Sequence, residues 1–98
     1  MSKSLIIDTK FARRDVQRMK TAIDELNAVK NQYRKAADNL NTLYKGNASE
    51  HLQNHLINYK IKKIDDIIKR LDSASNNLNK TIKKVEEENR KLTNIMKS

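Results

Sequence analysis

Apolar residues follow a four-three rhythm along the second half of the chain. From Ile57 to Met96 they are separated alternately by four and three residues, and within this series only Ser75 and Asn89 are polar. A repeat of 3.5 residues keeps one stripe of a helix facing a partner, as in a left-handed coiled coil. The series therefore predicts one long helix with a continuous seam. Its apolar members are Ile57, Ile61, Ile64, Ile68, Leu71, Leu78, Ile82, Val85, Leu92 and Met96.

The first half of the chain carries a similar but less regular stripe. The rhythm is kept by Ala12, Val16, Met19, Ile23 and Leu26. Val29 then follows after a second step of three, and the rhythm resumes at Tyr33, Ala36, Leu40 and Leu43. A doubled step of three is a stammer, which locally overwinds a supercoil. The pattern predicts a second long helix with a shift in its apolar face near Val29.

One glycine interrupts the helical pattern. Gly46 is the single glycine, and proline is absent. Glycine readily adopts the left-handed conformation that ends a helix, so Gly46 is expected just past the first helix, and Asn47 or Ser49 can cap the second. The expected single domain 1–98 has a first helix over about 8–44, a turn over about 45–48 and a second helix over about 48–97.

The apolar stripe is wider than a two-helix seam requires. Leu56, Ile67, Ala74 and Ile95 lie beside the seam of the second helix, and such width suits a bundle in which each helix touches two others. The predicted fold is all-α: an antiparallel two-helix hairpin that forms a helical bundle with a partner chain. The predicted partner interface consists of Val16, Met19, Ile23, Leu26, Ile57, Ile61, Ile64, Ile68, Leu71, Leu78, Ile82, Val85 and Leu92.

Composition limits the class of protein. The chain has 98 residues, no cysteine and a formal net charge of +9. No apolar run approaches the roughly 20 residues that span a bilayer, and we expect the N-terminal residues not to be a cleavable leader. Basic residues are dispersed among acidic ones, which favours a solvated surface or an acidic protein partner. A basic nucleic-acid-binding module is less favoured, because the three tyrosines are scattered and the helices are too long for a helix-turn-helix.

The sequence offers little for catalysis or metal binding. His51 and His55 are four residues apart on one helix face, as in zinc-binding pairs, but we interpret them as surface histidines near the turn. Adjacent carboxylates such as Asp65 and Asp66 point apart on a helix. There is no nucleophile elbow or glycine-rich phosphate loop. We expect no enzyme activity, no cofactor and no metal.

The turn motif Tyr44-Lys45-Gly46 carries a family resemblance. A chain of this length, hairpinned at a central aromatic-x-Gly, resembles the WXG family of small type VII secretion proteins, with tyrosine in place of tryptophan. The resemblance implies two long helices that assemble into four-helix bundles. Family members carry Tyr-x-x-x-Asp or Tyr-x-x-x-Glu near the end of the second helix, whereas here Tyr59 is followed by Lys63.

A related pattern occurs near the other end of the chain. Phe11 and Asp15 are four residues apart, so they share a helix face and form a candidate export signal. In an antiparallel hairpin the start of the first helix and the end of the second lie at the same pole, so the signal would sit where the family's tail signal lies. The alternative is that Phe11 packs against the adjacent apolar stripe.

Basic charge, the divergent turn and the missing tail motif make the chain most similar to the small helical helpers of LXG toxins. This resemblance implies a partner or targeting factor that binds the helical N-terminal domain of an LXG-type effector, another small helical protein or both, and promotes the effector's export. The alternatives are a secreted WXG-like homodimer and a self-assembling structural coiled coil. The expected location is the cytoplasm, with export through type VII secretion, if it occurs, needing no cleaved signal peptide.

Overall fold

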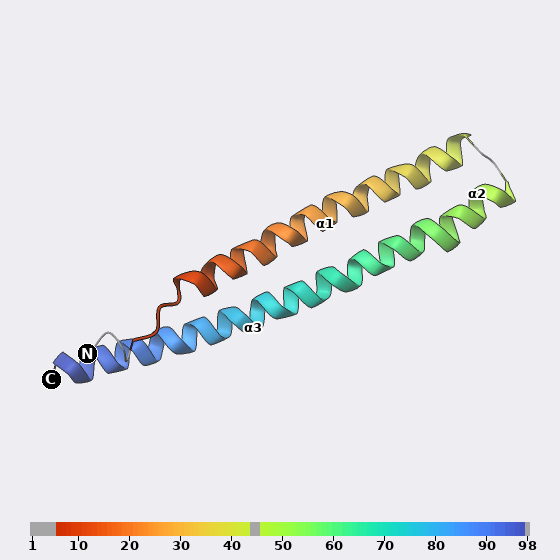
Figure 1. The fold of residues 1–98 in the computed structure, drawn as a ribbon. Helices are drawn as coiled ribbons and strands as arrows, with labels where there is room; N and C mark the ends of the chain where they lie inside the picture. Colours follow the sequence, from red (N-terminus) through yellow and green to blue (C-terminus); the bar gives the residue numbers. More distant parts are fainter. Residues whose placement is uncertain (1–5, 44–45, 98) are drawn as a thin grey trace.

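The chain folds into a long helical hairpin. The computed structural model describes residues 6–43 and 46–97, and this part of the chain contains helices and no strand. The first rod is α1 (Lys10–Leu43), and the returning rod consists of α2 (Asn47–Leu52), the π-helical turn η2 (Gln53–Ile57) and α3 (Asn58–Lys97). The rods run antiparallel, and the molecule measures 76 × 15 × 14 Å (Figure 1). The predicted all-α antiparallel hairpin is confirmed.

Residues Asp8 and Thr9 provide hydrogen-bond acceptors for backbone N–H groups at the start of α1. The carbonyl of Thr9 accepts the backbone N–H of Arg13 at 3.0 Å, which makes Thr9 the residue before the first turn. The carboxylate of Asp8 accepts the N–H of Lys10 at 2.9 Å. The first four N–H groups of a helix lack partners within it, so this bond stabilises the start at Lys10.

The four-three series of the second rod faces α1. Each member from Ile57 to Leu92 is buried or half-buried, whereas the last predicted member, Met96, is exposed. Full burial is confined, among the described residues, to Ile57, Ser75 and Ile82 on this rod and Val16 on α1. Two helices touch along a single line, so most of each apolar stripe keeps some contact with solvent.

The predicted stammer in the first helix is wrong. Lys30 and Ala37 are half-buried, while Val29, Ala36 and Leu43 are exposed, so the rhythm runs through Lys30 without a shift. The Lys30 amine lies 2.8 Å from a carboxylate oxygen of Asp65. A lysine can cover a seam with its aliphatic stem while its charge reaches the edge. The seam of α1 is Ala12, Val16, Met19, Ile23, Leu26, Lys30, Tyr33, Ala37 and Leu40.

Gly46 begins the second rod. Its φ is +124°, a value that L side chains rarely adopt, which confirms the predicted need for glycine. Its carbonyl accepts the N–H of Glu50 at 3.2 Å, so Gly46 takes the capping position of α2. Asn47 is the first residue of that helix rather than its cap, and the side chains of Asn47 and Ser49 lie outside the described residues.

The π-helical turn η2 was not predicted. Extended back from Ile57, the four-three rhythm would place Asn54 in the seam, but Gln53 is half-buried there and Asn54 is exposed. A π-turn contains an extra residue and so rotates the preceding helix. This rotation brings Gln53 to α1, where its Nε2 donates to Oδ1 of Asn41 at 2.5 Å.

Candidate interaction surface

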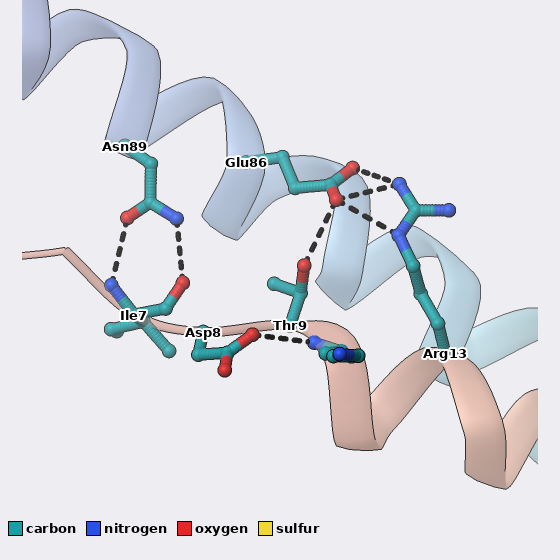
Figure 2. A network of polar contacts seen from close by, with 7 residues as sticks. Ile7, Asp8, Thr9, Arg13, Glu86 and Asn89 are labelled. Atoms are coloured by element: carbon teal, nitrogen blue, oxygen red, sulfur yellow. Dashed lines mark hydrogen bonds and ion pairs between the residues drawn. The ribbon is translucent and has the colours of Figure 1, made fainter.

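A short extended strap, residues 6–9, lies against the C-terminal part of α3 (Figure 1). The side-chain amide of Asn89 holds it through both backbone groups of Ile7. The Ile7 N–H donates to Asn89 Oδ1 at 3.1 Å, and Asn89 Nδ2 donates to the Ile7 carbonyl at 2.7 Å (Figure 2). The polar residue that interrupts the seam therefore fixes the N-terminal segment.

Glu86 anchors the start of α1 next to the strap. Its carboxylate accepts from Arg13 Nε at 3.0 Å and Nη2 at 2.6 Å, and from the Thr9 hydroxyl at 2.9 Å (Figure 2). These hydrogen bonds, the one from Arg13 first, lower the pKa of Glu86, and the carboxylate raises the pKa of Arg13. The network holds α1 against α3 at the end of the hairpin where α1 begins and α3 nears its end.

A groove of about 830 Å³ lies at this same pole. It is lined partly by apolar side chains of the strap, Ile6 and Ile7, and by Met96 of α3. Residues 6–9 leave the end of α3 partly uncovered, since Met96 is 42% and Ile95 69% exposed.

The candidate export signal lies on the outer surface of α1. Phe11 is 68% exposed, and the guanidinium of Arg14 lies 5.6 Å from its ring centroid. Asp15 is exposed and lies 3.9 Å from Arg18 in a weak ion pair. The ring of Phe11 therefore does not pack into the seam of the hairpin, which leaves both residues accessible to another protein.

The two flanks of the seam differ. We name the seam positions a and d of a seven-residue repeat. The row that follows d is then e, and the row that precedes a is g. Reversing one helix exchanges its two sides, so in an antiparallel pair e lies beside e and g beside g. Arg13 and Glu86 are both e residues, and Asp65, also e, binds Lys30. We call this flank, with Asn41, the closed edge.

The opposite flank carries exposed apolar side chains, with polar residues among them at Asp15, Lys60, Thr81 and Glu88. Leu43 is 73%, Ile67 47% and Val29 39% exposed. The inter-helix bonds place Val29 level with Ile67. The sequence pattern indicated that Ile67 widens the stripe, but it placed Val29 in the seam, where the structure has Lys30. We call the apolar part of this flank the open edge, which consists of Ala22, Val29, Ala36, Leu43, Ile67 and Ala74.

The residues predicted to form the partner interface lie in the seam between the rods. They contact the other arm of the same chain, and most keep part of their surface exposed. Their contact with a second protein stays a prediction. The residues concerned are Val16, Met19, Ile23, Leu26, Ile57, Ile61, Ile64, Ile68, Leu71, Leu78, Ile82, Val85 and Leu92.

The turn region holds the remaining candidates. Tyr44 of the turn motif lies outside the described residues. His51 and His55 are exposed, with ring centroids 4.4 Å apart and planes tilted by 38°. Within residues 6–43 and 46–97, no group of three or more His, Cys, Asp or Glu side chains could hold a metal ion.

Two further findings concern membrane spans and similarity to known proteins. In the part of the chain that the structure describes, no helix combines the length and apolar character needed to cross a bilayer. Comparisons with protein-family models, curated proteins and solved structures find no match. Any functional argument therefore depends on the surface of the hairpin.

Proposed function

We propose that this chain is a partner and targeting factor of type VII secretion, which binds the helical N-terminal domain of an LXG-type effector by helix–helix packing and promotes the effector's export. The observation that carries the proposal is the incomplete apolar core. Most seam residues are only half-buried, and large apolar side chains such as Leu43 and Ile67 are exposed. Packing against further helices would bury both the half-buried seam residues and the exposed apolar side chains.

The pole of the hairpin supports the export part of the proposal. Phe11 and Asp15 are exposed, and Arg13, between them, is held to α3 by Glu86. The ion pair fixes the start of α1 on α3, so the two candidate signal residues would be presented in one orientation. A receptor that reads an aromatic ring and a carboxylate one helical turn apart could bind this face without disturbing the seam.

Affinity capture tests the binding part. The tagged chain would be purified from its native host after nuclease treatment, and the co-eluting proteins would be identified and quantified by mass spectrometry. We expect a stoichiometric larger protein with a helical N-terminal domain. Recovery of the chain with itself alone would contradict the proposal and favour self-assembly. Recovery of other proteins only when the nuclease is omitted would favour the basic nucleic-acid-binding alternative.

Paired substitutions test the export part. Phe11→Ala and Asp15→Asn are expected to reduce effector export while the captured complex remains intact. Tyr59→Ala and Asp66→Asn are matched controls, because both residues are exposed on α3 away from this pole. Equal export by all four variants would contradict the signal role of Phe11 and Asp15.

A further inference from the structure

The open edge has the dimensions of a docking site for a helix. From Ala22 to Leu43 it spans roughly 32 Å at 1.5 Å per residue. Its side chains are small at one end, where the register brings Ala22 level with Ala74. They are larger near Val29 and Leu43. Small residues allow close approach of another backbone, and larger ones supply apolar area.

Cations flank the open edge on its α3 side. Lys63 and Arg70 lie four residues before and three after Ile67, which makes them its neighbours on the helix surface. Lys84 follows fourteen residues after Arg70, with the neutral Asn77 between them, and Lys91, which pairs with Glu88 at 3.5 Å, follows after seven more. Within the described residues Arg70 and Lys84 have no ion-pair partner, so their charges are available to another chain.

The α1 side of the open edge has no such charge. The corresponding positions are Arg18, Glu25, Gln32 and Asn39, which together are neutral. At these positions a second copy of the hairpin would offer a single carboxylate, Glu25, to each cationic row. It would also bring together two chains that each have a net charge of +9. Charge complementarity therefore favours a different protein with acidic residues over a second copy.

We propose that the open edge is the docking surface for an amphipathic helix of a different protein, whose flank toward α3 carries carboxylates that pair with the Lys63, Arg70 and Lys84 row. The inference rests on the proposed function and adds to it the edge that the partner occupies and the charge that it presents. The closed edge, whose polar groups already bind one another, stays in contact with solvent.

A designed probe tests the edge and the charge without the natural partner. We would use a synthetic amphipathic helix of about 28 residues, long enough to be helical in contact, with leucine at its seam positions and glutamate at the flanks. A second peptide carries lysine at the flanks. The glutamate peptide is expected to bind the hairpin at least about tenfold more tightly in calorimetry, because only it complements the cationic row.

Methyl NMR locates the bound peptide. Shifts are expected at Val29 and Ile67 on the open edge, and not at Thr93, which lies in the e row at the opposite flank. Arg70→Glu with Lys84→Glu is expected to abolish the preference for the glutamate peptide. Lys62→Glu with Lys83→Glu makes the same charge change on the side of α3 turned away from the open edge, and should keep the preference.

Several results would overturn the inference. They are equal binding of both peptides, binding of neither, shifts centred on the closed edge, or sedimentation of the hairpin as a dimer that buries Ile67. These results leave the proposed function standing if the capture experiment yields a helical effector. Conversely, peptide binding at the open edge without any captured helical protein would support the docking surface and contradict the type VII assignment.

Discussion

At the scale of single residues, polar side chains in the seam have three different roles. Ser75 is 2% exposed, and its hydroxyl donates to the Asp72 carbonyl on the same helix at 3.0 Å. Lys30 covers the seam with its stem and pairs with Asp65 at the edge. Asn89 binds the strap rather than a seam residue of α1. The three polar seam positions therefore differ in role: Ser75 fills a small buried site, Lys30 covers apolar surface with its stem, and Asn89 binds the backbone of the strap.

Ser75 offers a test of how tightly the seam packs. Because the site is fully buried with a small side chain, Ser75→Leu should force neighbouring side chains apart and lower the free energy of unfolding by about 1–3 kcal/mol. Ser75→Ala should change it by less than about 1 kcal/mol, since the lost hydrogen bond is local to the helix. Urea unfolding followed by circular dichroism measures both. A gain in stability for Ser75→Leu would show that the seam has unfilled space.

The carboxylates of Glu86 and Asp65 predict a dependence of stability on pH. Hydrogen bonds from Arg13 and Lys30, respectively, lower their pKa values in the folded chain below the ordinary 4.5 and 3.8. Folding is therefore favoured fully above those ordinary values, and this contribution disappears as pH falls through the lowered pKa values. Melting temperatures should be insensitive to these two groups from pH 7 to about 5 and fall below about pH 4.

Glu86→Gln should make that acid-induced loss shallower, because the glutamine cannot be protonated. Glu87→Gln is the matched control, since Glu87 forms no ion pair among the described residues. An equal acid response in the wild type and both variants would mean that the Arg13–Glu86 contact does not contribute in solution.

At the scale of elements, the hairpin depends on how each rod begins. The N-terminal strap and Asp8 determine the start of α1. Gly46 determines the start of α2, and the turn η2 then rotates the rod so that Gln53 faces α1. The long helices themselves follow from an apolar repeat without proline, which propensity and packing both favour.

Gly46→Ala tests the turn. A Cβ at Gly46 would have no atom within 4 Å beyond its own residue and its two chain neighbours, so the expected cost comes from the backbone, whose φ of +124° is strained for alanine. The substitution should lower the free energy of unfolding by about 1–2 kcal/mol without changing the helical content of the folded state. A variant as stable as the wild type would indicate that the turn relaxes to another conformation.

Asn89→Ala tests the strap. Loss of both hydrogen bonds to Ile7 should increase amide exchange at Ile7 by about tenfold, which corresponds to losing one net hydrogen bond. The helices should melt nearly as before, because the seam around Asn89 remains. Asn76→Ala, at an exposed site on the same helix, should leave exchange at Ile7 unchanged. Unchanged exchange in Asn89→Ala would mean that the apolar contacts of Ile6 and Ile7 hold the strap by themselves.

At the scale of the whole molecule, two rods cannot enclose a core. A hairpin with an extent of 76 × 15 × 14 Å and four fully buried residues among those described has little apolar area removed from water. The isolated chain should therefore unfold at low urea concentration. A partner that binds only the folded hairpin should raise its free energy of unfolding by about 4 kcal/mol when the free partner concentration is about a thousand times Kd. Titration of a captured effector domain in thermal melts measures this gain, and absence of a gain would contradict helix-on-helix packing.

The amino-acid sequence by itself determined the helical class, the position of the turn and the seam of the second rod. These features depend on local periodicity and on backbone preference, which a short window of residues contains. The seam series from Ile57 to Leu92 is buried or half-buried throughout, and Gly46 has the positive φ expected of it.

Only the tertiary structure decided which polar residues belong in the seam and which flank stays open. Lys30 takes a seam position because Asp65, 35 residues away, receives its charge, and Asn89 serves a strap 82 residues away. Such pairs depend on the register between the rods, which no local pattern encodes. The same register places Val29 and Ile67 together on the open edge, because folding back one helix on the other brings their g rows to one side.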